Sequence, residues 1–595
     1  MGARVSGALG LVLAVALGCA GRSTRSESDD GGEGASDGAG GSGGVAGTST
    51  SGGSAGVGGS AVGNTGGTIS TGGGAIGAGG SAGTPIGGTS GMPGAAGGVA
   101  GDGGAGAPPL GEPEWFVIGS LPLSPRAFQR TVAHLLGLAI DETLPRERLR
   151  LIPSVDANVD APELPSLTEI ARREVNAMDE LALRDVLGCV DSSRACGEKI
   201  ATDFAPRAFR RPLTQRESEV VLEVFDAVVS ASPLKETVIA VLSIPRAQWL
   251  RAVGTRDELG AYRLDDYEMA SILSYGLTAL PPDEQLRATA AAGQLRDPFR
   301  RREEAERLLA TSAGLETYTD FVRDWFRIKE PEDFWFYDGN PGLADAMELE
   351  TSLFIEAATF DEAAPVTELL SAPWSILSAT LIEHYGVTTS DASARVDLSA
   401  TRRRGMLHQG SFLASHSYQE QGALIARSVA TLKLLCEKVP EPPVEVPPIP
   451  PPEPGLTYRD RLSQATASAG CRGCHSSLDP VAFSFGKFDG YGAFVEVDEG
   501  VPIDAAGTVQ TFDGLVFSFD DSADLAEQIA AHPRFAECFN RNLVSAFVGE
   551  AIEHPAMTDY VERFAADGAV RSMVESVLAW VESEHFVRRH PELLP

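Results

Sequence analysis

The sequence has few basic residues, few cysteines and, beyond its first residues, no long hydrophobic run. Its 48 lysines and arginines stand against 82 acidic residues, which leaves a formal net charge of −34. Nucleic acids and anionic lipid surfaces would repel such a chain, so we expect no nucleic-acid partner. The body also lacks H-E-x-x-H, a glycine-rich phosphate loop and the residue order of a serine hydrolase triad, so these patterns do not support a hydrolase.

The amino terminus has the pattern of a bacterial export signal. Arg4 precedes an apolar run over residues 5–17, which is long enough for a secretory signal and too short to span a bilayer. The run ends in Ala16-Leu17-Gly18-Cys19, which resembles the lipobox of bacterial lipoproteins, whose cysteine is acylated after cleavage. We therefore expect residues 1–20 to be a signal peptide with a lipobox-like end and Cys19 to be lipidated. Cleavage after Ala20 without a lipid and an uncleaved anchor are the alternatives, because Ala16 stands where a large aliphatic residue is usual.

Residues 21–111 form a second compositional region, made almost entirely of Gly, Ser, Ala and Thr. Too few large apolar side chains are present to offset the entropy lost on folding, so we expect a disordered linker. A flexible coil of about 80 residues spans roughly 50 Å, enough to hold a folded body away from a membrane. We expect an exported protein of the cell envelope, at the outer membrane or the cell surface, attached to the membrane through its N-terminal lipid.

Helical patterns dominate the rest of the chain, and we expect a mainly α fold. Ser124-Pro125, Thr214 with Glu217, and Asp265 with Glu268 have the form of helix N-caps, and apolar residues at helical spacing follow each of them. The paired carboxylates Asp265-Asp266 and Asp520-Asp521 are explained in the same way, as caps or solvated loops rather than catalytic acids.

The same patterns predict several consecutive domains after the glycine-rich stalk. We expect helical bundles over residues 112–255 and 256–438, and a small cytochrome c-like helical domain over residues 455–595. Between them, residues 439–454 are rich in proline and favour an extended polyproline linker.

One motif in the last region carries specific chemistry. Cys471-Arg-Gly-Cys474-His475 matches the C-x-x-C-H of c-type haem attachment, in which two thiols add to the haem vinyl groups and the histidine binds the iron. Cysteines on one helical turn can reach both vinyl groups, while the next residue turns its imidazole toward the iron. We expect a helix over residues 458–469 to end at the motif. One covalent haem c on Cys471 and Cys474, with His475 as the proximal ligand, is the preferred assignment.

Other interpretations of this motif remain open. A Cys471–Cys474 disulfide would use the same residues, and so would another metal or two unmodified thiols. Zinc would need two further ligands, and the chain offers no second cysteine pair for it. The distal iron ligand is unassigned, and its candidates are Met557, His554, Met573, His408 and His416. The following aromatic residues, which either pack on the porphyrin or belong to the ordinary core, are Phe483, Phe485 and Phe488.

Four longer segments closely resemble a family of large exported bacterial proteins. The segments contain Phe209-Arg210-Arg211-Pro212, Asp265-Asp266-Tyr267-Glu268, Arg404-Gly405, and Cys471-x-x-Cys474-His475 with Phe488-Asp489-Gly490-Tyr491-Gly492. These proteins are built from consecutive domains of unknown function, numbered fifteen-eighty-five to fifteen-ninety-five, with fifteen-ninety-two at the centre. The resemblance covers most of residues 120–590 and implies a helical multidomain chain with a C-terminal cytochrome c-like motif. This chain departs from its relatives at Gly549-Glu550, where Gly-Arg is common, and at Leu478, where many have Met.

Two classes of function follow from these patterns. The first is a c-type haem protein that acts in electron transfer with a redox partner protein, or in redox chemistry on a small oxidant. The second is a surface-displayed, non-haem binding or scaffold protein whose cysteines are structural. No residue is assigned a catalytic role by these patterns.

The remaining cysteines are expected to form disulfides. Of seven cysteines, Cys19 is assigned to lipid and two to haem, which leaves Cys189, Cys196, Cys436 and Cys538. In an oxidising compartment an even remainder favours two disulfides. We prefer Cys189–Cys196, which closes a short loop, with Cys436–Cys538, which ties the proline-rich segment to the last domain.

We predict that the mature protein begins at an acylated Cys19, because the apolar run ends at Gly18-Cys19. Mass spectrometry of the mature N-terminal peptide should find diacylglycerol on this cysteine. A mature chain that begins at an unmodified Gly21 would rule out the anchor and leave export intact.

Overall fold

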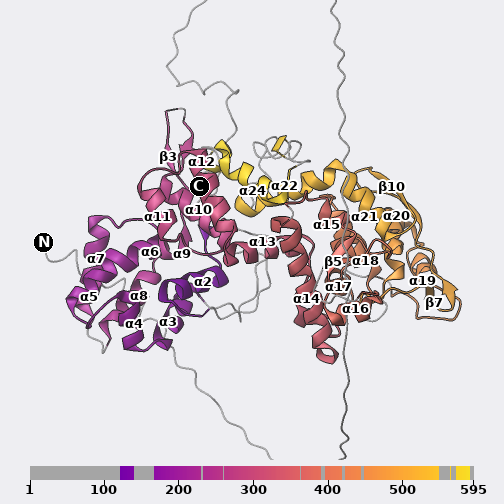
Figure 1. The fold of residues 1–595 in the computed structure, drawn as a ribbon, viewed down its shortest axis with the longest axis horizontal. Coiled ribbons are helices and arrows are strands. Elements are labelled where there is room, and N and C mark those ends of the chain that lie inside the picture. The colour runs from indigo at the N-terminus through magenta and orange to yellow at the C-terminus, as the bar shows by residue number, and fades with distance from the viewer. Residues whose placement is uncertain are drawn as a thin grey trace, which may run out of the picture. The chain divides into compact units, whose positions relative to one another are not determined.

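The computed structural model describes residues 121–139, 166–228, 232–258, 260–361, 363–389, 395–418, 422–443, 446, 448–548, 563–564 and 571–589. The predicted signal peptide, Cys19 and the glycine-rich linker lie outside these residues. The described part of the chain is mainly helical, which confirms the predicted fold class (Figure 1). None of its helices is both long enough and apolar enough to cross a membrane.

Short helices and strand pairs make up the first part of the body. Its elements are β1 (Leu121–Pro122), α2 (Pro125–Leu136), α3 (Leu167–Ala177), α4 (Glu180–Leu187), α5 (Arg194–Lys199), the π-helical turn η1 (Ile200–Phe204), α6 (Ala205–Phe209), α7 (Gln215–Ala227), α8 (Pro233–Leu242), α9 (Pro245–Gln248), β2 (Trp249–Leu250), β3 (Thr255–Arg256) and β4 (Tyr262–Arg263). β1 pairs with β2 and β3 with β4, both antiparallel.

Longer helices follow in the middle of the chain. The elements are α10 (Asp266–Thr278), α11 (Glu284–Ala291), α12 (Pro298–Leu309), α13 (Ser312–Trp325), η2 (Pro331–Asp333), η3 (Tyr337–Gly339), α14 (Pro341–Glu356), η4 (Ala357–Asp361), α15 (Glu368–Ser371), β5 (Trp374–Ile376), α16 (Ala379–Tyr385), β6 (Arg395–Asp397), η5 (Met406–His408), α17 (Gly410–Ser415) and α18 (Leu424–Lys433). β5 and β6 form an antiparallel pair. The proline-rich residues that follow have no helix or strand in their described part.

The last part combines helices with two small hairpins. Its elements are α19 (Tyr458–Ala465), α20 (Ala469–Ser484), η6 (Phe485–Lys487), β7 (Val497–Asp498), β8 (Val501–Pro502), β9 (Gly507–Gln510), β10 (Val516–Phe519), α21 (Ser522–Ala531), α22 (Pro533–Val548), α24 (Met573–Glu582), α25 (Glu584–Val587) and β11 (Arg588–Arg589). β7 pairs with β8 and β9 with β10.

The predicted helix starts are confirmed. Ser124 caps α2, and Thr214 with Glu217 and Asp265 with Glu268 form reciprocal capping boxes at α7 and α10. Asp521 likewise caps α21 through the main-chain N–H groups of Ala523 and Asp524. In each case a side-chain oxygen accepts from N–H groups that have no partner within the helix, which is why these residue types predict helix starts well.

The C-terminal elements return to the middle of the chain. α24 packs beside α12 (Figure 1), and β11 pairs with β4. The contact is held by two consecutive arginines: Arg302 forms ion pairs with Glu575 and Glu582, while Arg301 donates to the main-chain oxygens of Val581 and Glu582. One hydrophobic core runs through residues from Leu123 to Val587, and a smaller core lies around α14 and α16.

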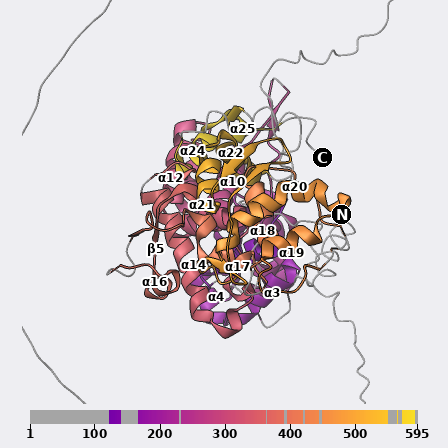
Figure 2. The same cartoon turned by 90° about the vertical axis from the view of Figure 1, so that its right-hand side faces the viewer.

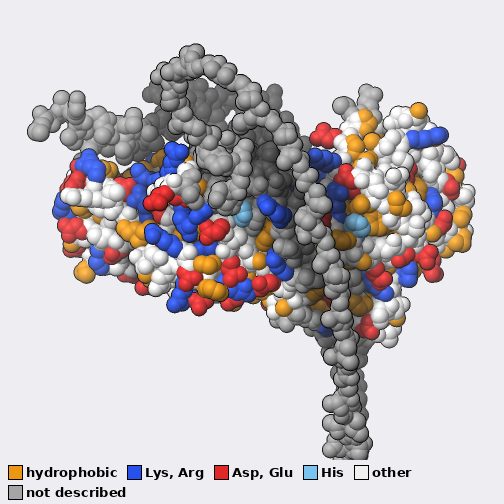
Figure 3. Space-filling view, turned by 90° about the horizontal axis from the view of Figure 1, so that it is seen from above, with side chains coloured by type: hydrophobic (Ala, Val, Ile, Leu, Met, Phe, Trp, Pro, Cys, Tyr) orange, Lys and Arg blue, Asp and Glu red, His pale blue; other side chains and the backbone are white. Residues whose placement is uncertain are grey.

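Charges of both signs are interspersed on the face of the body shown in Figure 3. Exposed ion pairs also lie along single helices, such as Arg216 with Glu223 and Arg300 with Glu303. Such exposed pairs stabilise a fold only weakly, so we attribute the stability of the body to its core, its buried polar contacts and its cross-links.

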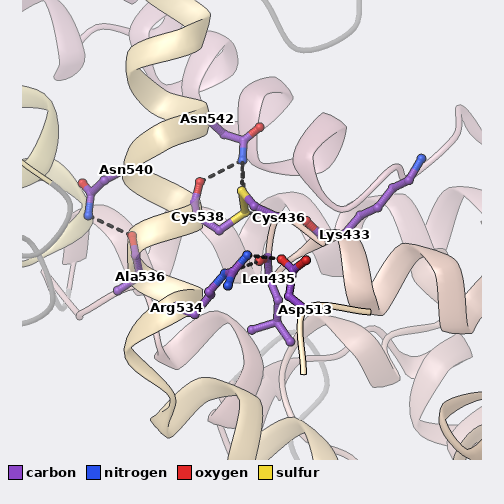
Figure 4. The surroundings of a disulfide bond; sticks show 9 residues. All are labelled: Lys433, Leu435, Cys436, Asp513, Arg534, Ala536, Cys538, Asn540 and Asn542. Atoms are coloured by element: carbon purple, nitrogen blue, oxygen red, sulfur yellow. Dashed lines mark hydrogen bonds and ion pairs between the residues drawn. A yellow bond between two sulfur atoms is a disulfide. The ribbon is translucent and has the colours of Figure 1, made fainter. Parts of the chain in front are cut away.

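Both predicted disulfides are confirmed. Cys189 bonds to Cys196 across 7 residues, and Cys436 bonds to Cys538 across 102 residues. The second bond joins the segment after α18 to α22 (Figure 4), where the amide of Asn542 donates to the main-chain oxygen of Cys538 at 2.8 Å. Arg534, on the same helix, donates to the main-chain oxygen of Leu435 at 3.1 Å and pairs with Asp513. The loop that this bond closes contains the C-x-x-C-H motif.

We predict that Cys436→Ser with Cys538→Ser destabilises the body by about 2–4 kcal/mol, because a cross-link over a long loop removes much of the entropy of the unfolded chain. Cys189→Ser with Cys196→Ser, which opens a short loop, is the matched control and should cost less. Denaturant titration of each double variant measures the loss. Equal losses in the two variants, or recovery of either cysteine pair as free thiols in non-reducing peptide maps, would contradict this account.

Candidate functional site

The C-x-x-C-H motif lies in the first turns of α20 rather than at the end of a preceding helix. The prediction of one helix over residues 458–469 was wrong, because α19 ends at Ala465 and α20 begins at Ala469. The hydroxyl of Ser468 accepts from the main-chain N–H of Cys471 at 3.3 Å and so starts a new helix. Serine next to a helix end can either continue the helix or cap the next one, and the sequence pattern does not distinguish these outcomes.

The two cysteines of the motif are free thiols and half-buried, whereas the other four described cysteines are paired. Cys474 packs against the main core, and the hydroxyl of Ser468 lies 3.1 Å from the sulfur of Cys471. The structure therefore does not contain the alternative Cys471–Cys474 disulfide. Both thiols are presented one turn apart on one helix, as attachment to two neighbouring groups of a ligand requires.

The imidazole of His475 is held by a carboxylate. Its Nδ1 lies 2.6 Å from Oδ1 of Asp479, one turn further along α20, and Oδ2 of Asp479 accepts from the hydroxyl of Thr466 at 3.3 Å. The side chains of His475 and Asp479 are 23% and 16% exposed. With Nδ1 held in this way, Nε2 is the ring nitrogen available to a metal, and no described residue hydrogen-bonds to it.

The other face of α20 is packed against the body. Helix α20 contacts α18 and β9, and α18 lies beside it in Figure 2. The hydroxyl of Ser477 donates to the main-chain oxygen of Gln510, and that of Ser428 to the main-chain oxygen of Leu478. Arg472, Gly473 and Ser476 are exposed. The motif therefore lies where the packed face of the helix meets its solvent face, within reach of a ligand.

The turn Phe488–Gly492, just after α20 and η6, binds side chains through every one of its main-chain oxygens. Arg427 donates to the oxygens of Phe488 and Asp489, and Arg403 to that of Gly492. The oxygen of Gly490 accepts from Trp335 Nε1 at 3.1 Å, and that of Tyr491 lies 2.8 Å from His384 Nε2. These contacts fix the C-terminal end of α20 relative to four other segments of the chain.

Both internal histidines proposed as distal ligands are core residues. His408 is buried, with Nε2 2.9 Å from the hydroxyl of Ser522 and Nδ1 2.7 Å from the main-chain oxygen of Arg404. His416 is not on a common helix face with it, since His408 ends η5 and His416 follows α17. Burial lowers the pKa of His408 to about 4 and that of His416 to about 3, so both are neutral at physiological pH.

The other sequence candidates divide between core and undescribed residues. Met573 is buried, and the hydroxyl of Thr359 lies 3.8 Å from its sulfur. Met557 and His554 lie outside the described residues, as does Gly549-Glu550. Phe485 and Phe488 belong to the core and contact the ring of His408, whereas Phe483 lies beside the guanidinium of Arg459.

The donor set fits a c-type haem better than a free metal ion. Across the described ranges, no group of three or more His, Cys, Asp or Glu side chains is placed to hold a metal ion. What α20 presents is two reduced thiols one turn apart, followed directly by an imidazole whose second nitrogen is held by a carboxylate. The thiols and the imidazole could be identified from the sequence motif, whereas Asp479 was missed, although its spacing of four from His475 on a helix was a usable signal.

Comparison with known proteins finds similarity over two consecutive regions. Residues 264–387 match the family described as PSD4, protein of unknown function (DUF1592), which confirms the central domain that the resemblance implied. Residues 403–498 match the family described as PSCyt3, also a protein of unknown function (DUF1588). No curated protein and no solved structure gave a match. The chain therefore contains two consecutive domains from families of unknown function, and the second of them includes Cys471, Cys474 and His475.

Proposed function

We propose that this chain is an exported, lipid-anchored c-type haem protein that acts in electron transfer or in redox chemistry on a small oxidant. The observation that carries the proposal is the arrangement on α20 of two free thiols and His475, with Nδ1 of the ring held by Asp479. The export pattern at the amino terminus supports it, because covalent haem attachment takes place outside the cytoplasm. The family that matches this region has the name PSCyt3, which contains the usual abbreviation for cytochrome.

Different residues of α20 would bind different parts of the haem. The thiols of Cys471 and Cys474 would each add their sulfur and proton across one vinyl double bond, which needs no oxidant. His475 would bind the iron through Nε2, while Asp479 keeps the proton on Nδ1 and sets the ring orientation. When bound, the haem would supply one-electron redox chemistry.

We predict that the protein matured in a host with the attachment machinery carries one haem that survives denaturation and acid–acetone extraction. The reduced protein should give a c-type absorption band, because thioether bonds saturate both vinyl groups. Cys471→Ala with Cys474→Ala should abolish the covalent haem. Cys189→Ser with Cys196→Ser is the matched control: it also removes two cysteines but should leave the haem content unchanged.

The test has a clear negative outcome. Wild-type protein that is colourless after maturation under these conditions would rule out the haem assignment. The chain would then be interpreted as a surface-displayed binding or scaffold protein, with its long linker and helical body presenting a binding surface.

We further predict that Asp479→Asn raises the reduction potential by about 60 mV, the equivalent of a tenfold change in a one-electron couple. The physical reason is that a carboxylate which accepts the Nδ1 proton makes the imidazole a stronger donor and stabilises ferric iron, and a neutral amide does this less. Spectroelectrochemical titration measures the shift. Asp479→Glu, which restores the charge, should return the potential toward the wild-type value at equal haem content. Identical potentials in all three proteins would show that Asp479 has a structural role only.

A further inference from the structure

A cavity of about 1130 Å³ lies beside α19 and the β7–β8 hairpin. Much of its wall is apolar, with contributions from Trp335, Phe483, Phe488, Val497 and Ile503. The proline-rich residues Pro450–Pro452 close another side, and Arg461 of α19 also lines the cavity. The wall also carries two arginines and four aspartates. A large cavity that combines an apolar wall with a few placed polar or charged groups is the usual form of a site for a small organic ligand.

Arg461 is buried without a full set of hydrogen-bond partners. It is 2% exposed, and its Nη1 donates to the main-chain oxygen of Pro450 at 3.0 Å. Its Nε and Nη2 are buried and have no partner in the described part of the chain. Arg301, which is equally buried, differs: its Nε, Nη1 and Nη2 all donate to main-chain oxygens. Unpaired donors on a buried cation are energetically unfavourable, so an additional acceptor at Arg461 would be favoured.

The carboxylates of the cavity wall are already engaged. Asp498 accepts from the main-chain N–H of Tyr458, and Asp504 pairs with Arg459. Asp489 accepts from the N–H groups of Tyr491 and Ala493, and Asp460 from that of Thr457. None of these four carboxylates accepts a hydrogen bond from Arg461. The group that Arg461 can still bind is therefore an anion from outside the described chain.

The free atoms define the shape of that anion. Nε and Nη2 lie on one edge of the planar guanidinium, and two parallel N–H bonds from this edge match the two oxygens of a carboxylate. We propose that the cavity binds an organic carboxylate with an apolar body, with the carboxylate on the Nε–Nη2 edge of Arg461 and the body against the apolar wall. Because both nitrogens are screened from solvent, binding requires a small outward movement of the wall.

A carboxylate of this kind has two possible sources. It can belong to a free acid, such as a fatty or aromatic acid, or it can be a propionate of the haem proposed above. Only the second source rests on the proposed function. Both use the same contact with Arg461, and the presence or absence of haem separates them.

The test uses decanoate as the probe and decanol as its uncharged counterpart, with binding to the full chain measured by titration calorimetry. We expect decanoate to bind at least about tenfold more tightly than decanol, and Arg461→Gln to remove this preference. Arg461→Lys, which keeps the positive charge but not the two parallel N–H donors, should lose part of the preference for decanoate. Arg459→Gln is the matched control on the same helix, because Arg459 lines the same cavity but is already paired with Asp504. It should leave the preference intact.

The same titrations on the Cys471→Ala, Cys474→Ala double variant distinguish the two sources. Equal binding by the haem-loaded and haem-free proteins identifies a free acid as the occupant. Binding by the haem-free variant alone identifies the haem propionate. The site is overturned if decanoate binds no more tightly than decanol to either form of the protein. It is also overturned if the Arg461→Gln variant, with its affinity for decanol unchanged, binds decanoate as tightly as the wild type does. Absence of covalent haem in the wild type would reject the proposed function but leave the comparison of decanoate with decanol valid.

Discussion

The structure around the candidate site depends on hydrogen bonds from four side chains, two of them buried arginines, to the main-chain oxygens of Phe488–Gly492. Trp335 and His384 come from the region that matches the first family, and Arg403 and Arg427 from the region that matches the second. The turn thus joins the two regions just after the helix that carries the motif. Its shape requires glycine: Gly492 has φ +78°, and a Cβ there would come within 3.2 Å of the Cα of Gly410.

The same type of contact recurs through the body. Arg210 donates to the main-chain oxygens of Ala208, Arg246, Ala247 and Trp249, and Arg301 connects α12 to the end of α24. Burial lowers the pKa of Arg301 to about 10 and that of Arg427 to about 9, so both remain charged at neutral pH. A buried charge that donates to several carbonyl oxygens makes strong, directional bonds, and its loss would leave those oxygens unpaired. These arginines therefore hold irregular segments that have little secondary structure of their own.

Local features of this fold, such as helix starts, could be predicted from the sequence. Hydrogen bonds from side chains to distant main-chain oxygens could not. Ser124, Thr214 and Asp265 predicted helix starts because a cap depends on a side chain and the next few residues. The expectation of two disulfides followed from the even number of remaining cysteines, and the preferred pairing from the short loop between Cys189 and Cys196. The contacts of the buried arginines could not be predicted from the sequence, because their acceptors are main-chain oxygens. Every residue has such an oxygen, so no residue type marks the one that is used. At the site, Cys471, Cys474 and His475 were identified from the sequence, but they were expected at the end of a helix and lie at the start of one. The error arose because Ser468 can either continue the preceding helix or cap a new one.

The candidate haem helix and the cavity beside α19 share one electrostatic environment. Burial raises the pKa of Tyr458, and the charges that act on its hydroxyl are Arg461 and Arg427, which lower the pKa, and Asp479, which raises it. Asp479 is the residue that holds His475, and Arg461 is the residue with the free edge. A carboxylate bound to Arg461 would offset one of the positive charges that act on Tyr458, and partial burial screens such an interaction less than water does. The Phe488–Gly492 turn holds the end of α20 in place, so this coupling would act through charge rather than through movement of the helix.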